Sequence, residues 1–316
     1  MSTVRFVPTF APRRPEGIRW LRSDGKPNFG DRIHRREGDA KLLATRPVHT
    51  TTRTETILEA LEKMAKYNVR VLPVVNPANQ KLEGIVTTMD FVNYLGGGDY
   101  YNIVVNRHGG ELISALRKEC VESIMNPNPH FVTVTDRLKT IIEKMVLNNV
   151  GVLPVVFADG TLWGIITEHD LVRHLAEKIV GKRVEDVMSK NVIYIPSSAT
   201  LGDALKIMIK YGVRRLPIVE EGGRVWGMIT AKDVVKFFGS HDVFRYTTTN
   251  RFEEVHEIPV KVVGTPVYYT IEPKADIGKA ATLMIEKNVS SLLVVENNKL
   301  VGIVTERDLL YGLATT

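Results

Sequence analysis

Cysteine is almost missing from this chain, which has a single thiol, Cys120, in 316 residues. One thiol can form neither an intramolecular disulfide nor a cysteine-based metal cluster. Long hydrophobic runs are missing too, and no stretch reaches the roughly 18 apolar residues that a membrane span needs. Arg5, Arg13 and Arg14 interrupt the N-terminus, unlike a secretory signal peptide. These absences predict a cytoplasmic protein without a membrane segment.

Sequence motifs of the common catalytic and nucleotide-hydrolysing sites are also lacking. The chain contains no G-x-x-x-x-G-K-[ST], H-E-x-x-H or G-x-S-x-G pattern. The glycines at 96–98 follow a predicted helix, whereas a dinucleotide-binding loop follows a strand. No nucleophile has an assignable base. We therefore predict a non-enzymatic protein with no catalytic cofactor and no bound metal.

Positive charge is concentrated at the N-terminus. Residues 1–41 carry ten basic and five acidic side chains, and so hold +5 of the net charge of +6. This arm has four prolines, interleaved aromatic residues and no helical periodicity. Such a segment is suited to RNA, whose phosphates pair with cations and whose bases stack on aromatic and guanidinium planes. The candidate RNA-binding residues are Arg5, Arg13, Arg14, Arg19, Trp20, Arg22, Lys26, Arg32, Arg35 and Arg36. A solvated tail, an arm packed on the core and an arm that binds a protein remain alternatives.

The most informative feature is a pattern that occurs four times. It consists of a glycine, a short apolar strand and Thr-x-x-Asp, and it stands at Gly84–Asp90, Gly164–Asp170, Gly227–Asp233 and Gly302–Asp308. A second apolar strand precedes each copy, and an amphipathic helix precedes that strand, as at 57–65. A helix should begin directly after each threonine. Each unit therefore predicts the order β-α-β-β-α and an α/β (α+β) fold.

These four units resemble CBS domains, whose tandem pairs are called Bateman modules. The resemblance covers about residues 42–313. The chain is similar to archaeal multi-CBS proteins and to the gamma subunit of AMP-activated kinase. It implies two Bateman modules behind an irregular basic N-terminal arm. The expected segments are the arm at 1–41, repeat 1 at 42–98, a connecting segment at 99–120, repeat 2 at 121–179, repeat 3 at 180–240, a second connecting segment at 241–258 and repeat 4 at 259–316.

The Thr-x-x-Asp motif has two compatible interpretations. As a helix N-cap it would contribute about 0.5–2 kcal/mol and need no ligand. As a ligand site it would offer a carboxylate that accepts both hydroxyls of a ribose diol, beside a helix start that attracts phosphate. The resemblance implies the second role for four pairs of residues, namely Thr87/Asp90, Thr167/Asp170, Thr230/Asp233 and Thr305/Asp308.

Cations near these helix starts are candidates for phosphate binding. His169, Lys232 and Arg307 precede their aspartates, and the resemblance implies a similar role for Arg70 and Arg214 on the preceding strands. The resemblance also implies AMP, ADP or ATP as the ligand.

Three functions remain open. The first is an adenine-nucleotide-binding regulator whose arm docks on RNA or the ribosome, as in a hibernation-type inhibitor. The second is a gamma-subunit-like regulator of a protein kinase or metabolic enzyme. The third is a structural scaffold with empty clefts. A homodimer is compatible with each of them.

Overall fold

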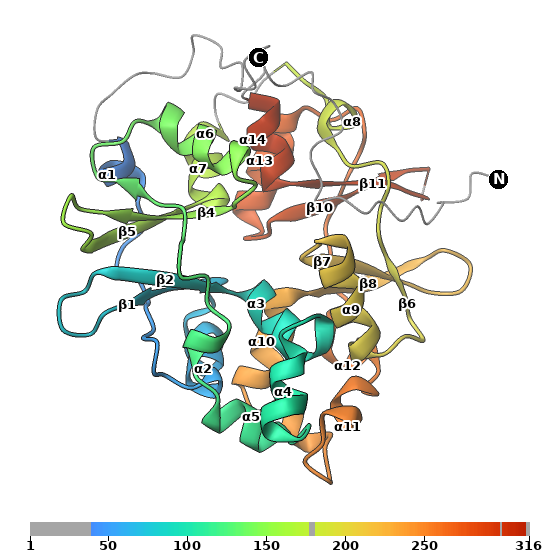
Figure 1. Cartoon of the computed structure of the whole chain (residues 1–316). Helices are drawn as coiled ribbons and strands as arrows, with labels where there is room; N and C mark the ends of the chain where they lie inside the picture. The colour runs from blue at the N-terminus through green and yellow to red at the C-terminus, as the bar shows by residue number, and fades with distance from the viewer. Residues whose placement is uncertain (1–38, 177–180, 298, 314–316) are drawn as a thin grey trace.

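The computed structural model describes residues 39–176, 181–297 and 299–313, and the ten candidate RNA-binding residues of the arm lie outside these ranges (Figure 1). The described chain confirms the mixed α/β fold with four repeats, three of which have the complete order β-α-β-β-α. Repeat 1 and its lead-in contain α1 (Asp39–Leu43), α2 (Ile57–Tyr67), β1 (Val71–Val75), β2 (Leu82–Thr87), α3 (Thr88–Val92) and the π-helix η2 (Asn93–Gly97). The segment that follows contains α4 (Tyr101–His108), α5 (Leu112–Lys118) and the 3-10 helix η3 (Val121–Ser123).

The remaining elements repeat this order. Repeat 2 contains β3 (Val132–Thr133), α6 (Leu138–Leu147), β4 (Val152–Val156), β5 (Leu162–Thr167) and α7 (Glu168–Leu175). Repeat 3 contains α8 (Val184–Val187), β6 (Ile195–Pro196), α9 (Leu201–Tyr211), β7 (Arg215–Val219), β8 (Val225–Thr230) and α10 (Ala231–Gly239), followed by η5 (Asp242–Arg245) and α11 (Phe252–His256). Repeat 4 contains α12 (Val260–Val263), β9 (Thr270–Ile271), α13 (Ile277–Glu286), β10 (Ser291–Glu296), β11 (Lys299–Thr305) and α14 (Glu306–Leu313).

Each repeat is built around a small sheet whose two long strands form an antiparallel hairpin. A two-residue strand adds in parallel to this hairpin in repeats 2, 3 and 4. Repeat 1 has only an isolated parallel bridge between Thr51 and Val74 at the equivalent place. Every hairpin has a register shift beside the glycine of the repeated pattern, as between Val74 and Val75. The bulge increases the local twist of the hairpin.

The two repeats of a module meet through their sheets. The first residues of repeat 2 bridge to repeat 1 at Asn126 and Ile85, and the first residues of repeat 1 bridge to repeat 2 at Thr45 and Ile165. This close approach explains the glycine of the pattern, because a Cβ on Gly84 would lie 2.9 Å from the Asn126 carbonyl oxygen. Each repeat is thus completed by a segment that belongs to its partner repeat.

Helices join the two modules to each other. One apolar core combines helices of repeats 1 and 3, and a second combines helices of repeats 2 and 4. The α2 and α10 helices form the most extensive of these contacts, with Leu61 fully buried at their interface. In Figure 1, the sheets of repeats 2 and 4 lie above the sheets of repeats 1 and 3 and face them across the middle of the molecule. The last helix of every repeat therefore begins near this middle layer.

Candidate nucleotide site

All four Thr-x-x-Asp motifs stand at a strand-to-helix junction, as the sequence predicts. In each one the aspartate Oδ2 accepts hydrogen bonds from the backbone N–H of the threonine at 2.7–2.8 Å and from its hydroxyl at 2.7–2.8 Å. One carboxylate oxygen is therefore used for capping in every repeat. Capping leaves the second oxygen, Oδ1, for hydrogen bonds to other groups.

The second oxygen has different surroundings in different repeats. The Oδ1 atom of Asp170 accepts a hydrogen bond of 2.8 Å from the hydroxyl of Thr45, near the start of repeat 1. Burial raises the pKa of Asp90 and of Asp233, although their threonine hydrogen bonds act in the opposite direction. A carboxylate that has lost water is stabilised by any added hydroxyl donor, and a sugar diol supplies two.

A network of charged side chains connects the helix starts. Glu168, the first residue of α7, has a side chain that is only 8% exposed. Its Oε1 accepts a hydrogen bond of 2.6 Å from Nε of Arg307, and its Oε2 lies 3.7 Å from Nη1 of Arg214. Burial favours the neutral form of Glu168, but these two guanidinium groups hold its pKa below the usual range. Glu168 is therefore ionised and shared between repeats 3 and 4.

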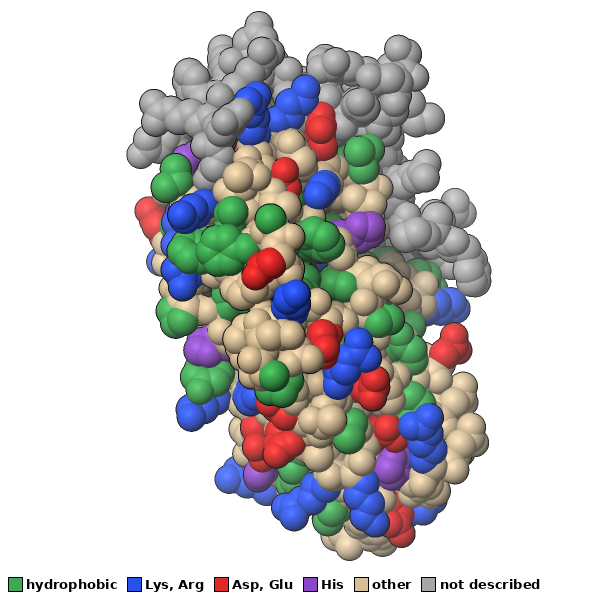
Figure 2. All heavy atoms as spheres, turned by 60° about the vertical axis from the view of Figure 1, so that its left-hand side comes forward, with side chains coloured by type: hydrophobic (Ala, Val, Ile, Leu, Met, Phe, Trp, Pro, Cys, Tyr) green, Lys and Arg blue, Asp and Glu red, His purple; other side chains and the backbone are tan. Residues whose placement is uncertain are grey.

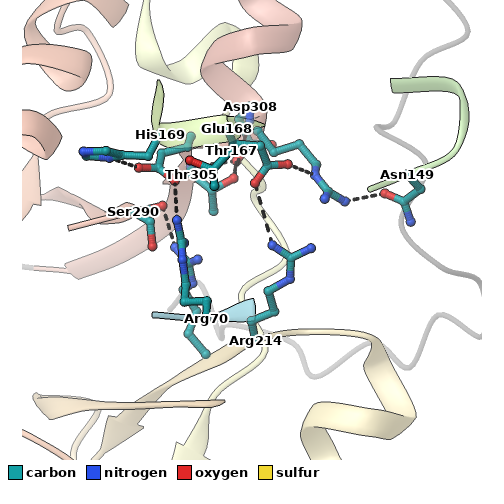
Figure 3. Close-up of polar contacts among 12 residues, drawn as sticks. Arg70, Asn149, Thr167, Glu168, His169, Arg214, Ser290, Thr305 and Asp308 are labelled. Carbon is teal, nitrogen blue, oxygen red and sulfur yellow. Dashed lines mark hydrogen bonds and ion pairs between the residues drawn. The ribbon is translucent and has the colours of Figure 1, made fainter. Parts of the chain in front are cut away.

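Glu306, the first residue of α14, has the same position in its own repeat. Its side chain is 2% exposed, with Oε1 2.6 Å from Nδ1 of His169 and Oε2 3.5 Å from Nη2 of Arg70. Figure 3 shows Arg70 and Arg214 reaching from one side toward the helix starts that carry Thr167 and Thr305. The two glutamates thus connect all four repeats through ion pairs.

The cluster holds more cations than these two glutamates can neutralise. Arg215 donates a hydrogen bond of 2.6 Å from Nη1 to the Ser290 carbonyl oxygen, and burial lowers its pKa to about 10, with Arg70 adding to the effect. Burial also lowers the pKa of Lys232, again with Arg70 nearby. Within the described ranges, the Nη2 atom of Arg307 is buried without a hydrogen-bond partner. Guanidinium and ammonium groups that have lost part of their water, with a donor such as this Nη2 unused, are a favourable environment for a phosphate group.

The structure therefore brings together most of the residues that the sequence singled out. Arg70, His169, Arg214 and Arg307 belong to one network, and the pKa of Lys232 responds to the charge of Arg70. The sequence analysis missed Glu168 and Glu306, which occupy the position after the threonine. Their signal is a difference between repeats, because this position holds Thr88, Glu168, Ala231 and Glu306 in order.

The part of the described surface that is visible in Figure 2 shows no large patch of one charge sign. On the face in Figure 2, Lys and Arg side chains are interspersed with Asp and Glu side chains. In the ranges that the structure covers, no three His, Cys, Asp or Glu residues lie close enough together to hold a metal ion. None of the helices in those ranges is long and apolar enough to cross a membrane.

The fold and this site define a class of protein that comparison with known families identifies. The family model described as CBS domain matches four times, at residues 39–97, 121–177, 184–240 and 255–315. The chain belongs to the CBS-domain family and contains four copies of the domain. The resemblance seen in the repeated sequence pattern is thereby confirmed.

Two relatives match over most of their length. Protein MJ1225 of Methanocaldococcus jannaschii is 33% identical over 272 residues, which cover 85% of this chain and 96% of that protein. Its crystal structure, described as that of a proposed archaeal homologue of gamma-AMPK, matches with a TM-score of 0.81 over 85% of this chain and 98% of that one. A second relative, from Thermofilum pendens, is described as an uncharacterized 33.4 kDa protein in the ribosomal RNA operon. It is 30% identical over 267 residues, which cover 84% of this chain and 88% of that protein.

Enzymes match over a smaller part of their length. Inosine-5'-monophosphate dehydrogenase of Aquifex aeolicus is 31% identical over 177 residues, which are 56% of this chain but only 35% of the enzyme.

Proposed function

We propose that this chain is a regulatory protein that binds adenine nucleotides and acts through binding rather than catalysis. The observation that carries the proposal is the convergence of Arg70, His169, Arg214 and Arg307 beside helix starts capped by Thr-x-x-Asp. In this proposal each bound ribose contacts an aspartate of the set Asp90, Asp170, Asp233 and Asp308, together with its threonine from Thr87, Thr167, Thr230 and Thr305. The phosphates of AMP, ADP or ATP extend toward the central cations, which include Lys232.

Two features support a nucleotide in particular. The site combines carboxylate acceptors with adjacent guanidinium and ammonium groups, and a nucleoside phosphate carries the matching diol and anion on one molecule. The structure described as a proposed archaeal homologue of gamma-AMPK also matches over 85% of this chain and 98% of its own. Since the match to inosine-5'-monophosphate dehydrogenase covers only 35% of that enzyme, it supports a shared regulatory module and not shared catalysis.

Calorimetry on nucleotide-stripped protein tests this proposal, and the chain offers a matched control. Asp203 caps α9 with the same geometry, accepting from Thr200 at 3.1 Å, but it lies at the first helix of repeat 3. Asp233→Asn should weaken AMP binding by about tenfold, the effect of losing roughly 1.4 kcal/mol. Asp203→Asn should leave AMP binding unchanged. Equal effects of the two substitutions would reduce Asp233 to a helix cap, and wild-type protein that binds no adenine nucleotide would leave an empty scaffold.

The regulated target is a separate part of the proposal. We propose that the basic arm docks the protein on RNA or the ribosome and couples energy state to translation. The charge of the arm supports this, and so does the relative in the ribosomal RNA operon of Thermofilum pendens. A gamma-subunit-like regulator of a kinase or metabolic enzyme is the alternative, favoured by the description of the MJ1225 structure. The cytoplasmic location and the homodimer stay predictions from the sequence.

Sedimentation separates these two targets. The full chain should co-sediment with ribosomes in low salt, and the logarithm of the binding constant should fall with the logarithm of salt concentration at a slope near −5 if about six phosphates are contacted. A variant that lacks residues 1–38 should not co-sediment. Unchanged sedimentation of this variant, together with affinity capture of one stoichiometric protein, would favour the enzyme-regulator alternative. Light scattering of the same samples reports whether two chains associate.

A further inference from the structure

We propose that Glu168 and Glu306 are internal counter-ions that occupy the phosphate positions of the unliganded protein and compete with incoming nucleotide phosphates. This inference rests on the proposed nucleotide function and deepens it by assigning the residues that set phosphate selectivity. It would make affinity depend on the number of phosphates as well as on the nucleoside.

The first argument is the distribution of these residues among the repeats. The position after the motif threonine holds a glutamate in repeats 2 and 4, and the uncharged Thr88 and Ala231 in repeats 1 and 3. The strand cations have the opposite distribution, with Arg70 and Arg214 in repeats 1 and 3. Capping does not require this alternation, because the same four helices already have a capping aspartate.

The second argument is the geometry of the ion pairs. Arg214 of repeat 3 pairs with Glu168 of repeat 2, and Arg70 of repeat 1 pairs with Glu306 of repeat 4. These contacts are long, at 3.7 and 3.5 Å, and Oε2 of Glu306 is buried with no hydrogen bond from any described residue. In an ion pair without a good hydrogen bond, the electrostatic attraction offsets only part of the free energy lost on desolvation. A phosphate oxygen that hydrogen-bonds the same arginines would replace this pairing with a better one.

The third argument is electrostatic. A carboxylate that neutralises a guanidinium group lowers the local positive potential, so that an added phosphate is less attracted and is also repelled by the carboxylate itself. The repulsion grows with the charge on the ligand, and it is absent for an uncharged nucleoside. Removal of one glutamate charge should therefore improve binding most for ATP, less for AMP, and not at all for adenosine.

Calorimetric titration of the stripped full-length protein with adenosine, AMP and ATP tests the inference. Glu168→Gln should lower the dissociation constant for AMP by about tenfold and that for ATP by more, while that for adenosine stays unchanged. Glu306→Gln carries the same prediction if the first variant fails to fold. Glu62→Gln is the matched control, because Glu62 lies on α2 with a side chain that is 43% exposed and pairs with His241, and its loss should change none of the three constants.

The outcomes distinguish this inference from the function on which it rests. If wild-type protein binds AMP but both glutamine variants bind AMP and ATP no better, the counter-ion role is wrong while nucleotide binding stands. Weaker AMP binding in both variants would assign the glutamates to positioning the arginines and would also overturn the inference. Wild-type protein that binds no nucleotide would remove both proposals. Glu168→Asp, which keeps the charge, should show a smaller gain than Glu168→Gln.

Discussion

Substitution of one buried leucine should destabilise two repeats that are far apart in the sequence. Leu61 of α2 is fully buried in the core that combines repeats 1 and 3. Leu61→Ala should cost about 3 kcal/mol from lost transfer free energy and a residual cavity. At about 2–4 °C per kcal/mol, the melting temperature should fall by about 6–12 °C. Leu42→Ala removes a side chain that is 79% exposed, and it should change stability by at most about 0.5 kcal/mol.

The reporter for this prediction is Trp226, a residue of repeat 3 that packs against the same core. A background with Trp20→Phe and Trp163→Phe leaves it as the single tryptophan, and Nε1 of Trp163 has no hydrogen bond to lose among the described residues. Thermal unfolding should then give one transition by tryptophan fluorescence and by circular dichroism, and both should shift together. A fluorescence transition that stays in place while circular dichroism shifts would refute a core shared between repeats 1 and 3.

Three further predictions concern single contacts. Gly84→Ala should destabilise the protein by about 1–3 kcal/mol in urea unfolding, because the new Cβ would lie 2.9 Å from the Asn126 carbonyl oxygen; unchanged stability would mean that this segment yields easily. Because the pKa of Glu168 is lowered from its ordinary value of 4.5, its ionised form should stabilise the protein above about pH 4.5, and this contribution should be lost as the pH falls through the folded-state pKa. Glu168→Gln should therefore flatten the acid side of the curve of stability against pH. An identical acid side in both proteins would contradict the ion pairing. Arg215→Met should lower the free energy of unfolding by about 1.5–3 kcal/mol, because it leaves the Ser290 carbonyl oxygen without its charged donor. An unchanged midpoint of urea unfolding would show that water replaces the guanidinium group.

The local structure of this protein could be predicted well from its sequence. The Thr-x-x-Asp pattern correctly predicted helices that start after Thr87, Thr167, Thr230 and Thr305, because the cap is formed by residues three positions apart. The two apolar strands predicted for each unit are the two strands of its hairpin. Local signals were sufficient wherever the stabilising partners are close in sequence.

The assembly of the repeats could not be predicted in the same way. The apolar faces of α2 and α9 carry the same periodicity, and nothing in a single helix specifies which other helix covers it. The partners of Glu168 are 46 and 139 positions away, so its sequence context shows only an acid near a helix start, which the helix dipole already explains. The ion-pair network became visible only when the helix starts were placed together.

The packing of one half of the chain on the other has a consequence for the ancestry of the chain. Because repeat 1 packs on repeat 3 and repeat 2 on repeat 4, a half-length ancestor would have used the same surfaces to join a second copy of itself. Gene fusion would have turned that homodimer contact into an internal one. Matching positions in the two halves could then differ, as His169 and Arg307 do, and a symmetric assembly could acquire non-equivalent clefts.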